Sequence, residues 1–180
     1  INVTNKLAIE SDSMNFAADV TATDLLLVTT ADIDQSAGVI TATNFIVDAD
    51  GSATLTGNNV VDRLAADAGV DFTFNNTIDL LITELTCGLT TVTGLTAGGD
   101  TNLTLTGLAV SNDRAINVTN KLAIESDSID FAADVISTDM LLVTTSDINQ
   151  SAGVITASNF IVDADGSATL TGNNEIDRLA

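Results

Sequence analysis

The chain has 180 residues, of which 45% are hydrophobic, and it carries twenty-five acidic residues against five basic ones and no histidine, for a formal net charge of −20. A surface with this much negative charge should repel nucleic acid and anionic membranes. We therefore expect no nucleic-acid partner. No apolar run approaches the ~18 residues that a membrane-spanning segment requires, so we expect no membrane insertion either.

The sequence repeats itself at a distance of 115 residues. Residues 1–65 return at 116–180 with 55 identities in 65 positions, and NFIVDADGSATLTGNN stands unchanged at 44–59 and 159–174. The least conservative difference is Val60 against Glu175, so this side chain is expected to face water in at least one copy. Because repetition at a fixed period indicates a modular array, we divide the chain into one complete unit, 1–115, and the first part of the next unit, 116–180. We expect the two to form one continuous solenoid within a longer array.

Short runs with alternating apolar and polar residues predict β-strands in chain order. They are KLAIES (6–11), LLLVTT (25–30), NFIVDA (44–49), ATLTG (53–57), VDFTF (70–74), DLLIT (79–83) and NLTLTG (102–107). Turn-forming residues lie between them: Asp-Gly at 50–51, Gly-Asn-Asn at 57–59, Asn-Asn at 75–76 and Gly-Gly-Asp at 98–100. VVDRLAADAG (60–69) is the only stretch that resembles a helix.

The turns also recur within the long repeat. Placing Asn5, Asp24, Asn44, Gly69, Asp100 and Asn120 in equivalent positions gives steps of 19, 20, 25, 31 and 20 residues. Each step holds about three short strands, which predicts an all-β fold: a right-handed parallel β-helix with about five coils per repeat. Six coils averaging nineteen residues remain the alternative. Strands one coil apart would pair at about 4.8 Å, and asparagine side chains at the turns would form hydrogen-bonded ladders.

Two phrases resemble the shaft repeats of filamentous-haemagglutinin-like exoproteins, which are giant bacterial surface adhesins exported by two-partner secretion. They are the N-x-V-D-x-L-A-A phrase at 59–66 and the T-A-G-G-D-x-x-L-T-L phrase at 96–105, within the wider stretches 40–67 and 94–107. The resemblance implies a right-handed parallel β-helix, an extracellular or cell-surface location and an outer-membrane secretion partner.

Asp48, Asp50 and Gly51 have the D-x-D-G form of a calcium loop. A complete loop needs a further ligand at its first position and an acid at its twelfth. Those positions hold Ile46 and Gly57, so we favour a solvated turn with Gly51 at positive φ, with a weak cation site as the alternative. We therefore assign no metal-binding and no cofactor-binding residue.

The residues that could support catalysis recur in both copies, whereas an active site normally occurs once. Without histidine, a nucleophile would depend on Lys6 or a carboxylate as its base, and Glu10 and Asp12 would share a face of a strand. The same residues return as Lys121, Glu125 and Asp127. We therefore expect no catalytic residue and no enzymatic activity.

Two features remain. Cys87 is expected to be a small, half-buried hydrophobic residue, with an inter-filament disulfide as the alternative. The Thr-Ala-Thr stretches at 21–23 and 41–43 lie one coil apart, as in ice-binding β-helices, but the second copy reads Ile-Ser-Thr and Thr-Ala-Ser. Ordinary surface threonine is the favoured interpretation.

These observations predict a structural role: the shaft of an extracellular bacterial fibre or giant adhesin, able to assemble into filaments or a sheath. Its partners would be further copies of the same repeat in the chain, and neighbouring filaments. The alternative is a binding module in which a face of the β-helix recognises carbohydrate or ice, although the aromatic content of 3% leaves few platforms for stacking on sugars.

Overall fold

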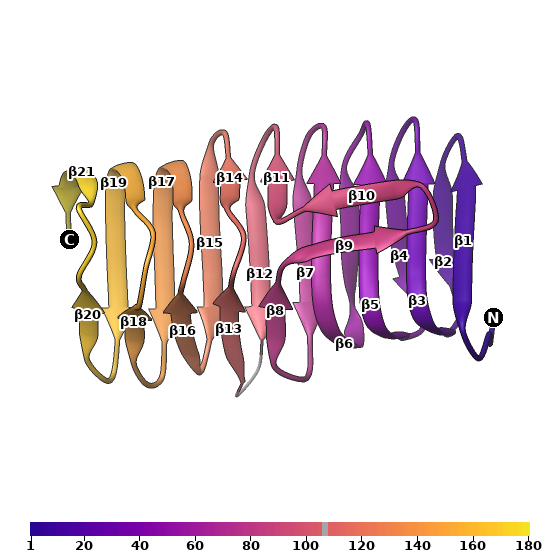
Figure 1. Cartoon of the computed structure of the whole chain (residues 1–180), viewed down its shortest axis with the longest axis horizontal. Helices are drawn as coiled ribbons and strands as arrows, with labels where there is room; N and C mark the ends of the chain where they lie inside the picture. The colour runs from indigo at the N-terminus through magenta and orange to yellow at the C-terminus, as the bar shows by residue number, and fades with distance from the viewer. Residues whose placement is uncertain (106–107) are drawn as a thin grey trace.

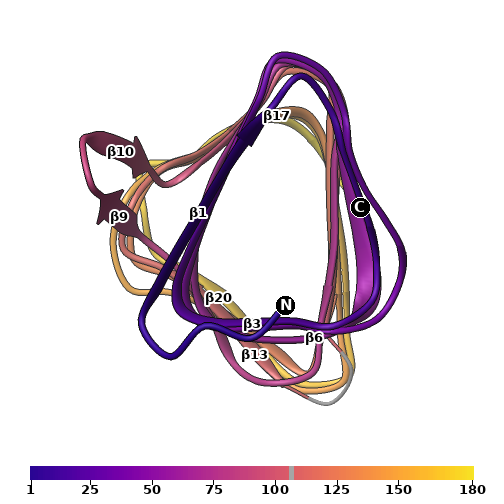
Figure 2. The ribbon, with the colours of Figure 1, turned by 90° about the vertical axis from the view of Figure 1, so that its right-hand side faces the viewer.

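The computed structural model describes residues 1–105 and 108–180, and over these ranges the chain forms a right-handed β-solenoid of about 9 turns. Seen from its N-terminal end, the chain runs clockwise around a triangular outline as it recedes (Figure 2). The described residues form 21 strands, and 19 of them belong to one sheet whose pairings are parallel. The all-β parallel β-helix predicted from the sequence is thus confirmed.

The first four turns have three faces, which we name A, B and C. Face A carries the longest stretches: β1 (Lys6–Ser11) and the second halves of β3 (Val20–Thr29), β5 (Ile40–Ala49) and β6 (Ala53–Ala68). Face B carries β2 (Met14–Ala17), β4 (Ile33–Ala37) and the start of β6. The short face C carries the first halves of β3 and β5 and the middle of β6.

The register on face A corrects one predicted step and shows that residues 60–68 form a strand. Asn44 pairs with Arg63 and not with Gly69, which follows the strand and donates its N–H to the Ala49 carbonyl at 2.8 Å. Through the first four turns the steps along the chain therefore stay close to twenty residues, and the 25-residue step is absent. The stretch 60–69 is extended within β6 and not helical, because every second residue from Leu64 onward faces the core.

The fifth turn differs from the others. It contains β7 (Phe72–Asn76) on face B, then β8 (Leu80–Ile82) and β11 (Leu95–Ala97) on face A. Between β8 and β11 the chain leaves the solenoid as a two-stranded antiparallel hairpin, β9 (Glu84–Cys87) and β10 (Thr90–Thr93). The hairpin adds its residues to a turn of ordinary length, which explains why one step is long. The sequence placed this step at 31 residues, whereas Phe72 pairs with Thr101, which makes it 29 residues.

Beyond the hairpin the long stretches lie on face B and face A is divided in two. Face B carries β12 (Thr101–Leu105), β15 (Lys121–Ser126) and the second halves of β17 (Val135–Thr144), β19 (Ile155–Ala164) and β21 (Glu175–Leu179). One part of face A carries β13 (Ala109–Asn112), β16 (Ser128–Phe131), β18 (Ile148–Gln150) and β20 (Ala168–Leu170). The other part carries β14 (Ile116–Val118) and the first halves of β17, β19 and β21. The predicted strand at 102–107 ends in two residues that lie outside the described ranges.

The two copies of the repeat consequently lie on different faces. Leu7 begins the column of face A that continues through Leu25, whereas its counterpart Leu122 stands in the column of face B, above Thr101 and Phe72. From β1 to β15 the chain makes five complete turns and about a third of another. The prediction of about five coils is confirmed, and each repeat is also rotated by about one face relative to the previous one.

The core is a single column of inward side chains that runs from Met14 to Phe160. Phe74 contacts Phe45 and Phe72, with ring centroids 6.1 and 6.2 Å apart. Inside one corner, Gln35 donates from Nε2 to Asn59 Oδ1 at 2.9 Å, and Asn59 donates from Nδ2 to Gln35 Oε1 at 3.1 Å. A buried amide pair of this kind satisfies polar groups that no water reaches.

Candidate functional site: the hairpin and the outer face

The hairpin leaves the solenoid at a single position. Ile82 pairs with Leu64 and Leu95 pairs with Ala66, so residues 83–94 occupy the place that Ala65 alone occupies one turn earlier. Gly94 closes the base by donating its N–H to the Thr83 carbonyl at 3.0 Å. Gly94 has φ +71° and its Cα lies against the backbone of the next turn, so a larger residue would be strained there.

The hairpin lies across the strands of the solenoid and not along them. Figure 1 shows β9 and β10 crossing the strands of face A toward β1, and in Figure 2 the hairpin projects from one side of the triangular outline. Its turn is a two-residue loop with Gly88 at φ +71°, the residue type that a type II′ turn needs at its first central position. The hairpin thereby contacts β3, β5 and β6, which belong to three successive turns.

The contact between hairpin and solenoid is apolar. Leu85, Cys87 and Val92 of the hairpin form a second cluster with three outward side chains of face A: Leu26, Ile46 and Ala65. This cluster is separate from the central column. It gives an outer layer to a sheet face that would otherwise expose large apolar side chains.

Cys87 is more buried than the sequence predicted, with 3% of its surface exposed. It is a free thiol in the middle of the apolar cluster, so it acts as a small hydrophobic residue. The alternative of a disulfide to a neighbouring filament would require the hairpin to open first.

The same outer face in the second copy has no hairpin over it. Leu141 and Ile161 are the counterparts of Leu26 and Ile46; Ile161 is 48% exposed whereas Ile46 is 1% exposed. Together with neighbouring side chains, Leu141, Ile161 and Ala180 line a hollow of about 580 Å³. Two surfaces of the same sequence are therefore present, one covered and one open.

A row of polar residues from successive turns, Lys6, Asp24, Asn44 and Arg63 in the first copy, borders each of the two surfaces. In the first copy Asn44 donates from Nδ2 to Asp24 Oδ1 at 2.7 Å, and in the second Asn159 donates to Asp139 Oδ1 at 2.6 Å. These bonds join successive turns, but each links one asparagine to one aspartate, so at these positions the structure has single pairs and not the predicted asparagine ladder. Asn44 Oδ1 is buried and has no hydrogen-bond partner among the described residues; Arg63 of the next turn pairs with Asn44 in the sheet.

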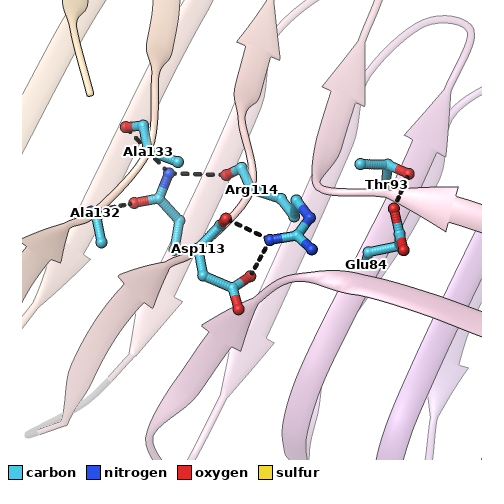
Figure 3. Close-up of polar contacts among 7 residues, drawn as sticks. Glu84, Thr93, Asp113, Arg114, Ala132 and Ala133 are labelled. Atoms are coloured by element: carbon cyan, nitrogen blue, oxygen red, sulfur yellow. Dashed lines mark hydrogen bonds and ion pairs between the residues drawn. The ribbon is translucent and has the colours of Figure 1, made fainter. Parts of the chain in front are cut away.

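A second polar cluster lies at the corner beyond the hairpin base (Figure 3). Asn112 donates from Nδ2 to the Arg114 carbonyl at 2.9 Å, and its Oδ1 accepts from the Ala132 N–H at 3.1 Å. Asp113 and Arg114 form an ion pair with 3.8 Å between Oδ1 and Nη1. On the hairpin, Thr93 donates to Glu84 Oε2 at 3.0 Å. The two Asn112 bonds hold the corner at which face A divides and join it to the next turn.

The D-x-D-G stretch packs closely against the backbone of the previous turn. Gly51 does not have positive φ, which corrects that prediction. Glycine fits there for a different reason: a Cβ would collide with the Asp32 side chain and the Ala31 backbone of the previous turn. Asp32 Oδ1 accepts a hydrogen bond from the Ser52 N–H at 2.8 Å, so a carboxylate of the previous coil holds the backbone that follows Gly51.

Asp48 and Asp50 do not lie in a metal-binding cluster: among the described residues no group of three or more His, Cys, Asp or Glu side chains could hold a metal ion. Asp48 is half-buried beside Asp67 of the next turn. Burial raises the pKa of Asp48 above the ordinary value of 3.8, and the carboxylates of Asp67 and Asp50 raise it further. This carboxylate is therefore a point of electrostatic repulsion on face A.

The repeated acids and lysines are separated by the rotation of the repeat. Lys6 lies on face A and Lys121 on face B, so their local positions agree but their faces differ. β1 ends at Ser11, which places Asp12 beyond the strand that contains Glu10, and β15 likewise ends before Asp127. The expectation that each acid pair shares a strand face is wrong, because the chain turns between its members.

The Thr-Ala-Thr stretches do stack, with Thr21 opposite Thr41 on face C. The next position in that row is Val60, and in the second copy Ile136 lies opposite Thr156. The threonine row is therefore two turns deep. Glu175, the counterpart of Val60, is exposed, as its exchange with valine predicted.

The chain matches no family model, and no curated protein or solved structure is significantly similar to it. The described residues contain no helix of the length and apolarity that crossing a membrane requires. The fold and the hairpin surface are thus the observations on which a function can be argued.

Proposed function

We propose that this chain is part of the shaft of an extracellular bacterial fibre or giant adhesin, in which near-identical repeats extend one solenoid. The observation that carries the proposal is the passage from the first copy of the repeat into the second without a break in the sheet or the core. A fold that adds turns in this way sets length by the number of repeats.

The backbone hydrogen bonds between turns would give the proposed shaft its mechanical continuity. Each turn pairs with the next over strands of up to ten residues, as in β3 with β5 and β17 with β19. These backbone bonds run along the long axis, so the sheet is continuous in the direction in which a shaft would be loaded. The hairpin ties three successive turns at a second level, through the side chains of Leu26, Ile46 and Ala65.

The charge is consistent with a shaft that stays dispersed. A net charge of −20 on a rod of this size disfavours unwanted association between sheet edges. The resemblance of residues 59–66 and 96–105 to filamentous-haemagglutinin-like repeats supports a surface location and export through an outer-membrane partner.

The test is immunogold electron microscopy of the source cells with antibodies raised against the 180-residue protein. We expect gold particles in rows along filaments outside the cell envelope. Gold confined to the cell interior would refute the extracellular shaft. Filaments that carry gold should also show the ~4.8 Å spacing of stacked strands in averaged images.

A face-binding function is the alternative, and the observation that favours it is the stacking of Thr21 with Thr41. An ice-binding face would produce thermal hysteresis in the purified protein, and Thr21→Leu would abolish it. Because the row is interrupted by Val60, the shaft is the better-supported proposal.

A further inference from the structure

We propose that the outer face made by Leu141, Ile161 and Ala180 is the docking site for a second hairpin, identical to β9–β10, supplied by a further copy of the repeat on the same chain. In each repeat the hairpin would pack against the outer face of the turns that precede it in the chain and hold them together. This inference goes beyond the shaft function, because it names the occupant of one surface and holds wherever the protein is located.

The apolar positions argue for this occupant. Leu26, Ile46 and Ala65 are the three solenoid side chains that the existing hairpin buries. Their counterparts 115 residues later are Leu141, Ile161 and Ala180, with no substitution at any of the three. An exposed isoleucine on a sheet face is unfavourable in water, and its retention in the second copy is explained if the same partner covers it.

The polar border argues in the same direction. The row Lys6, Asp24, Asn44 and Arg63 beside the covered surface returns as Lys121, Asp139, Asn159 and Arg178 beside the open one. In the first copy the tip of the hairpin reaches this row, where Gly88 lies close to Lys6 Nζ. The open surface thus presents both the apolar floor and the polar margin that the hairpin meets in the first copy.

The strands beneath the two surfaces have the same register. Leu26 pairs with Ile46, and Leu141 pairs with Ile161, each on the outer side of a ten-residue strand. A hairpin leaving the solenoid one turn beyond Ala180 would therefore meet the same spacing of side chains. Tethering to the same chain would supply it at an effective concentration of about millimolar.

The rotation of the repeat adds a geometrical consequence. The covered surface lies on face A and the open one on face B, so successive hairpins would lie about a third of a turn apart. Their separation along the axis would be about 26 Å, from five and a third turns at about 4.8 Å each. Three repeats would clasp all three sides of the rod.

The test compares the 180-residue chain with a chain extended by a second copy of residues 66–115, which continues the repeat in register after Ala180. Both carry Cys87→Ala, as does the copied cysteine, and Ile161→Cys provides a reporter thiol. In the short chain the thiol should react rapidly with a maleimide. In the extended chain we expect its reaction to be at least tenfold slower, because the docked hairpin covers it.

Two positions calibrate the measurement. Ile46→Cys, under the existing hairpin, should react slowly in both chains, since Ile46 is 1% exposed. Ile136→Cys should react rapidly in both, because Ile136 is 43% exposed and lies on face A, away from the proposed site. Replacing the copies of Leu85 and Val92 by aspartate in the extension should restore rapid reaction at position 161.

The proposal is overturned if the thiol at position 161 reacts equally fast in both chains while amide exchange shows that the extension is folded. Should the extension not fold, a backbone-cyclised peptide of residues 83–94 at about 1 mM replaces the tether. Protection by this peptide, and none by its Leu85→Asp, Val92→Asp form, supports the proposal; no protection by either overturns it. Protection in the short chain that grows with protein concentration would also overturn it, since a second molecule would then be the occupant.

Discussion

Ile46 and Ile161 allow the contribution of the hairpin to be measured within one molecule. They stand in identical sequence, NFIVDADG, on equivalent strands, but 1% of Ile46 and 48% of Ile161 is exposed. Ile46→Ala removes a side chain packed between the sheet and the hairpin, and we expect it to cost about 2–3 kcal/mol. This is the lower part of the range for core substitutions, because the hairpin is a single layer that can move inward and fill part of the cavity. Ile161→Ala removes a half-exposed side chain and leaves no cavity, so about 0.5–1 kcal/mol is expected.

The loss of β-propensity is common to both substitutions and cancels in the difference, which should be about 1–2.5 kcal/mol. The assay is urea unfolding followed by circular dichroism, fitted with a model of coupled turns because a solenoid need not unfold in one step. Leu27→Ala and Leu142→Ala form the control pair: both side chains point into the column and both are 0% exposed, so their costs should agree. Equal costs for Ile46→Ala and Ile161→Ala would refute the stabilising role of the hairpin. Unequal costs for the control pair would show instead that the C-terminal turns unfold separately.

Three further predictions concern single side chains. Because burial and neighbouring carboxylates raise the pKa of Asp48 above 3.8, its ionised form opposes folding; stability is lost as the pH rises through the folded pKa. Asp48→Asn should therefore raise the melting temperature at pH 7, and this gain should shrink below pH 3.8. Asp163→Asn, at the exposed counterpart, should change the melting temperature little. A gain from Asp48→Asn that persists at low pH would contradict the role of the ionised carboxylate. Asn59→Ala removes the partner of a buried glutamine amide and should cost about 1–3 kcal/mol in urea unfolding, more than Asn174→Ala in the open second copy. Gly94→Ala should destabilise the hairpin base, seen as faster amide exchange in β9 and β10 than in β5; unchanged exchange would show that the base tolerates a Cβ.

The sequence predicted the fold class because period-two alternation and near-exact repetition are local signals. KLAIES at 6–11 is a strand with the bounds that its pattern indicated, and NFIVDA at 44–49 forms the second part of a strand that begins at Ile40. VVDRLAADAG at 60–69 was the only stretch that resembled a helix, but Leu64, Ala66 and Ala68 alternate into the column and β6 continues to Ala68. Pairing with the previous turn outweighed local propensity there.

The candidate surface was less predictable. The run ELTCGLTTVT at 84–93 contains the signal of a two-residue hairpin, alternating residues on both sides of Gly88, but a strand of a coil gives the same alternation. Gly51 shows the same limit: its glycine suggested positive φ, while the actual constraint is the approach of Asp32 from the turn below. Both depend on which residues of other turns lie nearby.

By itself, then, the amino-acid sequence determined the strands, the stacking of turns and the continuation of one repeat into the next, because each is set by alternation and by similarity between successive segments. The tertiary structure decided three other things: that residues 83–94 fold back across face A, that the repeat rotates by a third of a turn, and that Ile46 is covered while Ile161 is open. These follow from where the chain leaves the column and from which turns then lie beneath it. Such distances between segments far apart in the sequence are fixed only when the solenoid has closed around its core.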